Sequence, residues 1–156
     1  TPGARFPTVL DNNQRAESWG VEFMSNVVLS ENWRVRLGYT YFDYEIWQTE
    51  ETVLPISEEF EALDPEHQIK IQSIANLGRG WSFDGVFRYS SRIEIREVVK
   101  SSVQPIDSYS GLDIRLAKSF DKLELAIVGR ELLKPRNAYV STLIPRCAFL
   151  QIKYTL

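Results

Sequence analysis

Several stretches of this chain carry charged residues at every second position. These residues are the ones best suited to bind a polar or charged partner. Arg34 and Arg36 show the spacing most clearly, within the stretch WRVRLGYTYFDY at 33–44. The residues with this placement are Glu22, Arg34, Arg36, Lys70, Asp84, Arg88, Asp113, Arg115, Glu124, Arg130 and Lys153. Alternation at period two puts such residues on one face of a β-strand. The sequence therefore predicts a face lined with charges of both signs.

Carboxylates are concentrated between residues 49 and 64. They are Glu50, Glu51, Glu58, Glu59, Glu61 and Asp64. Carboxylate oxygens suit hard cations, but this spacing matches no calcium-binding loop. We interpret the stretch as a solvated loop and predict no metal site and no cofactor.

Nothing in the chain has the spacing of a catalytic group. His67 is the one histidine, so it has no second histidine for a metal site and no recognisable triad. Cys147 is the one cysteine and is expected to pack in the wall of the last strand. No glycine-rich phosphate loop occurs. We predict that the chain is not an enzyme.

Charge and hydropathy exclude further classes. The formal charge of −3 argues against nucleic acid, which needs a basic face. No run approaches the roughly 18 apolar residues of a spanning helix, whereas membrane β-strands need only about 9 to 11 residues. The opening TPGARFPTVLDNNQ lacks the pattern of a signal peptide, so we expect the true N-terminus to lie elsewhere.

The elements that must carry the charged face are about seven β-strands, and we expect no helix. Period-two alternation predicts them at about 17–29, 33–47, 65–77, 81–97, 107–120, 123–130 and 146–156. Residues 1–15 are expected to be a loop. The connections run short and long in turn: SEN, 49–64, GRG, 98–106, DK and 132–144.

That alternation favours an antiparallel up-and-down meander in an outer-membrane barrel, with short periplasmic turns and long extracellular loops. Seven is odd, whereas bacterial single-chain barrels have an even number of strands. We therefore expect an all-β chain that is part of a larger transmembrane β-barrel in outer-membrane lipid. Trp33, Trp81, Tyr39, Tyr41 and Tyr89 are interpreted as its interfacial girdle.

Several stretches together resemble the C-terminal barrel region of TonB-dependent outer-membrane receptors. They are AESWGVEF at 16–23, WRVRLGYTYFDYE at 33–45, DPEHQIKIQS at 64–73, SYSGLDIRLAKSF at 108–120, LELAIVGRELLKPRNAY at 123–139 and IPRCAFLQIKYTL at 144–156. The family's Gly-x-Asn-Leu-Leu segment is matched at Gly129, Leu132 and Leu133, with Glu131 in place of asparagine. The family usually ends in an aromatic residue, where this chain has Leu156.

The resemblance implies that residues 1–156 are the C-terminal part of a receptor in the bacterial outer membrane. Such a receptor imports a scarce nutrient, often a ferric siderophore, with energy passed through TonB. Its plug, its TonB contact and its earlier strands are absent from this chain. The chain would supply barrel wall and extracellular loops, in which Glu58, Glu59, Glu61, Arg96, Lys100 and Arg136 are candidate contacts for a small-molecule or metal-chelate ligand.

Two questions stay open at the level of sequence. Arg34, Arg36, Lys70, Arg88, Arg115 and Arg130 would face the lumen. There they would either hold the plug through charge pairs or be tolerated by a watery interior. An alternative function is a soluble β-meander barrel that binds an apolar small ligand, and a further one is a small outer-membrane barrel enzyme.

Overall fold

The computed structural model describes residues 14–48, 64–93, 106–133, 136–138 and 142–156. Their strands are β1 (Gln14–Ser30), β2 (Trp33–Gln48), β3 (His67–Gly78), β4 (Trp81–Ser90), β5 (Tyr109–Phe120), β6 (Leu123–Arg130), β7 (Arg136–Ala138), β8 (Thr142–Ile144) and β9 (Cys147–Tyr154). One antiparallel sheet of seven strands has the order β1-β2-β3-β4-β5-β6-β9, and β7 and β8 form a separate hairpin. The expected all-β meander is confirmed, and the described ranges contain no helix.

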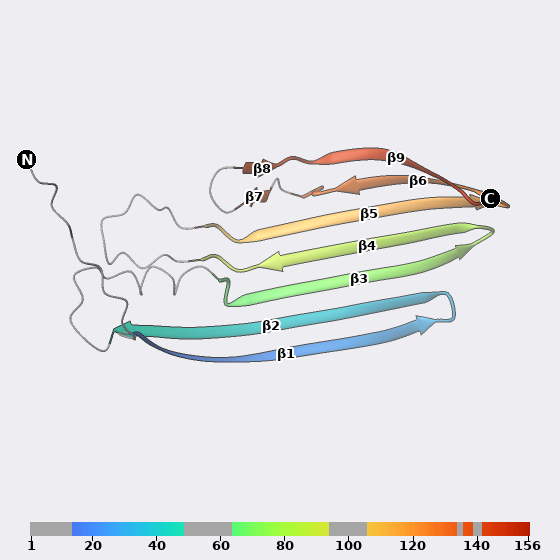
Figure 1. Ribbon diagram of the computed structural model, residues 1–156. Coiled ribbons are helices and arrows are strands. Elements are labelled where there is room, and N and C mark those ends of the chain that lie inside the picture. Colours follow the sequence, from blue (N-terminus) through green and yellow to red (C-terminus); the bar gives the residue numbers. More distant parts are fainter. Residues whose placement is uncertain (1–13, 49–63, 94–105, 134–135, 139–141) are drawn as a thin grey trace, which may run out of the picture.

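The strands are joined at opposite ends by connections of two kinds. The three tight turns, at 31–32, 79–80 and 121–122, lie together at one end of the sheet, and the long connections leave from the other (Figure 1). Gly78, Arg79 and Gly80 all have positive φ, which glycine adopts without strain. A Cβ on Gly80 would lie 2.5 Å from the carbonyl oxygen of Ser119, so this turn packs closely on β5.

Three details of the sequence prediction were wrong. Strand β1 begins at Gln14, inside the stretch expected to be loop. Strand β4 ends at Ser90 instead of near residue 97, and beyond it Ile93 and Ile106 form an isolated antiparallel bridge. Strands β7 and β8 lie in the stretch 132–144, which was expected to be a plain connection. Strands of three residues are too short for alternation to reveal them.

The register of the sheet separates an apolar face from a polar one. Directly opposed residues of neighbouring strands share a face. One such row crosses β2, β3, β4 and β5 and consists of Trp33, Ala75, Phe83 and Leu116. We call this the apolar face. The apolar row Leu123, Leu125 and Ile127 of β6 continues it, opposite Tyr154, Ile152 and Leu150 of β9.

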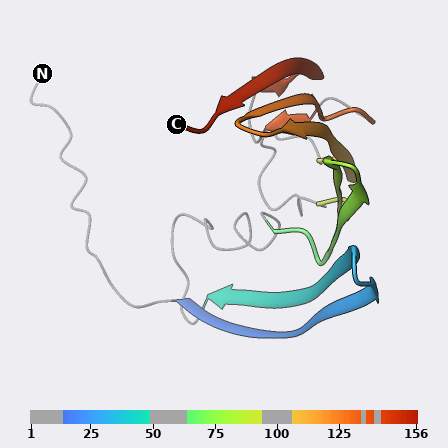
Figure 2. The same ribbon diagram turned by 90° about the vertical axis from the view of Figure 1, so that its right-hand side faces the viewer.

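The sheet curls into an open trough (Figure 2), and the two faces differ in exposure. Ile127 and Leu150 on the apolar face are 62% and 64% exposed, whereas Ala117 and Ala126 on the polar face are 0% and 2% exposed. Side chains on the concave side of a curved sheet converge and cover one another. The exposures therefore assign the polar face to the concave side of the trough.

The sheet is not closed. Strands β1 and β9 form its two edges, and neither has a further strand partner among the described residues. The described part of the chain also holds no helix with the length and apolarity required to cross a membrane.

Candidate functional site

The polar face gathers all the charged residues expected from their spacing. The polar face extends from β2 to β9 through pairs of directly opposed residues. Examples are Arg36 and Gln72, Lys70 and Arg88, Asp84 and Arg115, and Glu124 and Lys153. Glu22 joins it through its pairing with Thr40. The polar face is therefore continuous over seven strands, and we treat it as the candidate site.

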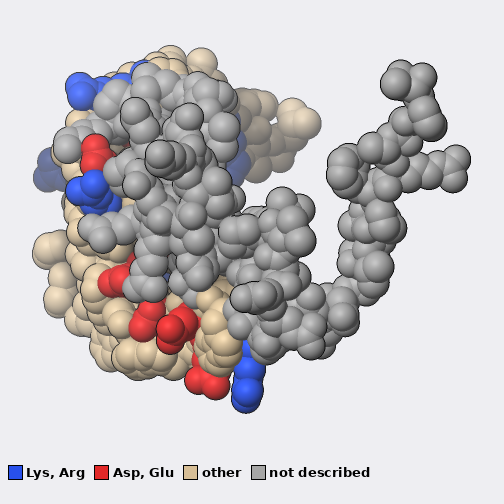
Figure 3. Space-filling view, turned by 90° about the vertical axis from the view of Figure 1, so that its left-hand side faces the viewer, with Lys and Arg blue, Asp and Glu red and all other residues tan. Residues whose placement is uncertain are grey.

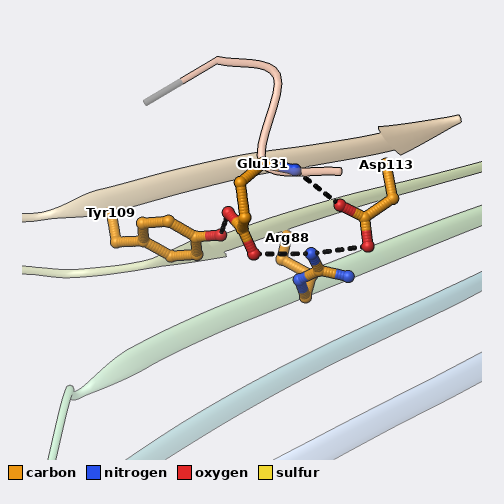
Figure 4. A network of polar contacts seen from close by, with 4 residues as sticks. All are labelled: Arg88, Tyr109, Asp113 and Glu131. Atoms are coloured by element: carbon orange, nitrogen blue, oxygen red, sulfur yellow. Dashed lines mark hydrogen bonds and ion pairs between the residues drawn. The ribbon is translucent and has the colours of Figure 1, made fainter. Parts of the chain in front are cut away.

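A network of four residues lies where β4, β5 and the end of β6 meet (Figure 4). Arg88 donates to Asp113 Oδ2 at 2.9 Å and to Glu131 Oε1 at 3.2 Å. Tyr109 donates its hydroxyl hydrogen to Glu131 Oε2, and the backbone N–H of Glu131 donates to Asp113 Oδ1 at 2.9 Å. Each of the four carboxylate oxygens thus accepts a hydrogen bond, which compensates for their partial removal from water.

The backbone at Glu131 brings its side chain into this network. Glu131 has φ of +55°, in the left-handed region that side-chain-bearing residues seldom adopt, and it is 9% exposed. The N–H of Leu132 donates to the carbonyl of Leu112 at 2.9 Å, which ties the bend to β5. Gly111 leaves the space for the Tyr109 hydroxyl, because a Cβ there would overlap it and would lie 3.0 Å from Glu131 Oε2.

A second group of ion pairs lies closer to the tight turns. Arg115 donates to Asp84 at 3.3 Å and to Glu124 at 2.6 Å, and the Ser119 hydroxyl donates to Glu124 at 3.3 Å. These side chains are about one quarter to one third exposed. Arg88 and Arg115 are therefore engaged by neighbouring strands, which limits their freedom to hold an external ligand.

The cations of β2 and β3 are arranged differently. Within the described residues, Arg34, Arg36 and Lys70 have no carboxylate within ion-pair distance. Arg130 lies with its guanidinium carbon 5.3 Å from the centroid of the Phe149 ring, a cation–π contact. The six cations expected to face the lumen therefore divide into two that are paired, one that is stacked and three that can accept an anionic partner.

Five of the expected loop contacts lie outside the described residues: Glu58, Glu59, Glu61, Arg96 and Lys100. Arg136 begins β7, of which only the backbone is described. The end of the sheet from which these connections leave carries charge of its own (Figure 3). At that end Glu17 is in register with Glu45, and Asp43 lies two positions before Glu45.

His67 and Cys147 take part in no cluster of catalytic type among the described residues. The Tyr39 hydroxyl and His67 Nδ1 are 3.0 Å apart, and the His67 ring lies 5.1 Å from that of Tyr41. Cys147 is exposed, so the expectation that it packs in the wall was wrong. It lies on the edge strand β9, which has a neighbour on one side only. The described residues hold no group of three metal-ligating side chains.

Sequence reasoning missed Tyr109 and Glu131 as members of the network, and it passed over Lys118. A signal for Glu131 was present, because it stands where the resembled family has asparagine, a residue enriched at positive φ. Lys118 interrupts the apolar row of β5 and was visible as the one charge between Leu116 and Phe120. Tyr109 gave no signal, since its partner lies 22 positions away.

No protein-family model matches this chain, and no curated protein matches it either.

Proposed function

We propose that this chain is a wall segment of a TonB-dependent outer-membrane receptor that imports a scarce nutrient such as a ferric siderophore. The observation that carries the proposal is the pairing of an exposed apolar face with a charged concave face across seven antiparallel strands. A wall strand of an outer-membrane barrel has this pattern, with lipid on one side and water on the other.

The exposures support lipid as the neighbour of the apolar face. A sheet in a soluble domain buries its apolar face against a second layer. Here Leu150 and Ile152 are each 64% exposed, and Trp33 is 45% exposed. Such a surface is stable in a bilayer, where apolar side chains need no protein cover.

The two open edges support a larger barrel. In lipid every backbone N–H and C=O must be paired, so an open sheet edge is not tolerated. Strands β1 and β9 would therefore pair with further strands of the same receptor, which would also bring the count to an even number. The plug and the TonB contact would belong to those other parts of the receptor.

The arrangement of the connections supports an orientation in the membrane. Tight turns at one end and long connections at the other match periplasmic turns and extracellular loops. The residues of the long connections, Glu58, Glu59, Glu61, Arg96, Lys100 and Arg136, are then candidates for ligand capture. Arg34, Arg36 and Lys70 would offer positive charge to an anionic partner in the lumen, either plug carboxylates or cargo.

The alternative of a soluble barrel around an apolar ligand has less support. Such a barrel needs apolar side chains on its concave side, whereas the exposures assign the charged residues to that side. No catalytic constellation among the described residues supports an outer-membrane enzyme.

Uptake of radiolabelled ferric siderophores by cells that lack the gene tests the proposal. We expect uptake of one of them to fall to background, to return with the full-length protein and to require TonB. In the restored cells, replacement of Arg34, Arg36 and Lys70 by glutamine is expected to reduce uptake, and Lys122→Gln in a tight turn is the matched control. A full-length protein found in the soluble fraction, without heat-dependent gel mobility, would refute the proposal.

A further inference from the structure

Lys118 is an anomaly on the apolar face. Its partner in the register is Trp81, and the residues two positions before and after it on β5 are Leu116 and Phe120. On the described strands, the other charged residues of this face are at the far end of β1 and β2: Arg15, Glu17, Asp43 and Glu45. Lys118 is thus the one charge on this face near the tight turns.

The surroundings of Lys118 fix its ammonium group without neutralising it. Nζ lies 5.4 Å from the centroid of the Trp81 ring and 5.5 Å from that of Phe120. It also donates a hydrogen bond to the backbone carbonyl of Arg79. An ammonium group has three donors, so two stay available. Among the described residues no carboxylate lies within ion-pair distance of Lys118 or of Arg79.

The apolar face has a hollow over β2, β3 and β4, and β4 is the strand that pairs with the strand of Lys118. The hollow, of about 350 Å³, is lined by Trp33, Ser73, Ala75 and Phe83, with Asn32 and Asn76 at the tight-turn end. The Trp33 indole N–H donates to the Ser73 hydroxyl at 2.9 Å, so the indole donor of this lining has a partner within it. Phe83 of this lining is two positions from Trp81, against which Lys118 rests.

We propose that this corner of the apolar face binds one anionic phospholipid, with its phosphate on Lys118 and Arg79 and an acyl chain in the hollow. Charge complementarity selects this occupant. Lys118, which has no acidic partner among the described residues, lies on an apolar surface, and Arg79 adds a second cation in the turn whose carbonyl Lys118 contacts. This combination matches a negative headgroup joined to a hydrocarbon chain. Lysine commonly lays its methylene stem along apolar surface and holds its ammonium group at the membrane interface. The inference rests on the proposed membrane location and adds a specific lipid partner to it.

Native mass spectrometry of the full-length protein in a neutral detergent tests the site, with phosphatidylglycerol and phosphatidylcholine of identical acyl chains as probes. We expect preferential binding of phosphatidylglycerol. Lys118→Gln and Arg79→Gln should each lower that preference about fivefold, the effect of one basic residue near an anionic membrane surface. Ala75→Leu, which fills the hollow, should weaken binding of both lipids. Lys153→Gln on the polar face should change neither.

Three results would overturn the assignment. The preference could survive the double replacement of Lys118 and Arg79, or Lys153→Gln could reduce it equally. Displacement of phosphatidylglycerol by an equal concentration of inorganic phosphate would instead assign the cations to a free anion. Insertion into vesicles, read as heat-dependent gel mobility, separates the two proposals. A protein that inserts without lipid preference refutes the lipid site alone, and one that fails to insert refutes both.

Discussion

Glu131 accepts a hydrogen bond at 3.2 Å from Arg88, a residue 43 positions earlier in the chain. The contact joins the bend after β6 to β4, across the intervening β5. Its side chains are 11% and 32% exposed, so water screens the pair only in part. Glu131 is itself buried, so the network around this contact is enclosed within the described part of the sheet.

Replacing Glu131 by alanine should lower the free energy of unfolding by about 1–3 kcal/mol, because Arg88, Tyr109 and the surrounding backbone lose a shared acceptor. Urea unfolding of the full-length protein in detergent measures the loss. Glu22→Ala, an exposed carboxylate on the same face, is the control and should change stability by less than about 0.5 kcal/mol. Equal effects of the two substitutions would mean that the network has no special role.

Gly111→Ala should destabilise the protein by about 1–3 kcal/mol, since the added methyl group overlaps the Tyr109 hydroxyl. In a Tyr109→Ala background the same change should cost much less, because the obstructing ring is gone. A double-mutant cycle on unfolding free energies measures this coupling. Additive effects would contradict the close approach of these two residues.

The assignment of faces can be tested on β2 with two neighbouring positions. Leu37→Arg puts a charge on the apolar face and should destabilise the inserted protein by about 2–4 kcal/mol if that face meets lipid near the midplane. Arg36→Ala, on the polar face, should cost far less. Unfolding in vesicles measures both, and similar losses would show that the faces are wrongly assigned.

Cys147 offers a chemical probe of the polar face. It is exposed and in register with Arg130, so a membrane-impermeant maleimide should label it in the full-length protein. A cysteine introduced at Leu150, on the apolar face in a Cys147→Ser background, should react with a lipid-soluble maleimide only. Labelling of both positions by the impermeant reagent would exclude lipid contact at Leu150.

The strands and their faces could be predicted from the sequence because alternation at period two is a local property. Trp33, Val35 and Leu37 reveal their common side without knowledge of any neighbour. The network could not be predicted in this way, since Arg88, Asp113 and Glu131 meet only through the register of three strands and a left-handed residue. The short strands β7 and β8 were not predicted for another reason. Each has three residues, which are too few to show an alternation of apolar and polar residues.

The order of the strands in this sheet is their order in the chain. Strands β7 and β8 lie outside the sheet, so β6 pairs directly with β9. Each pair of strands joined by a tight turn is therefore a removable unit that begins and ends at the same side. Duplication or loss of one such unit would change the width of the sheet by two strands, while every remaining strand keeps its direction and its apolar face on the same side. Sheets built in this way can change size during evolution by whole hairpins, and the parity of the strand count is preserved automatically.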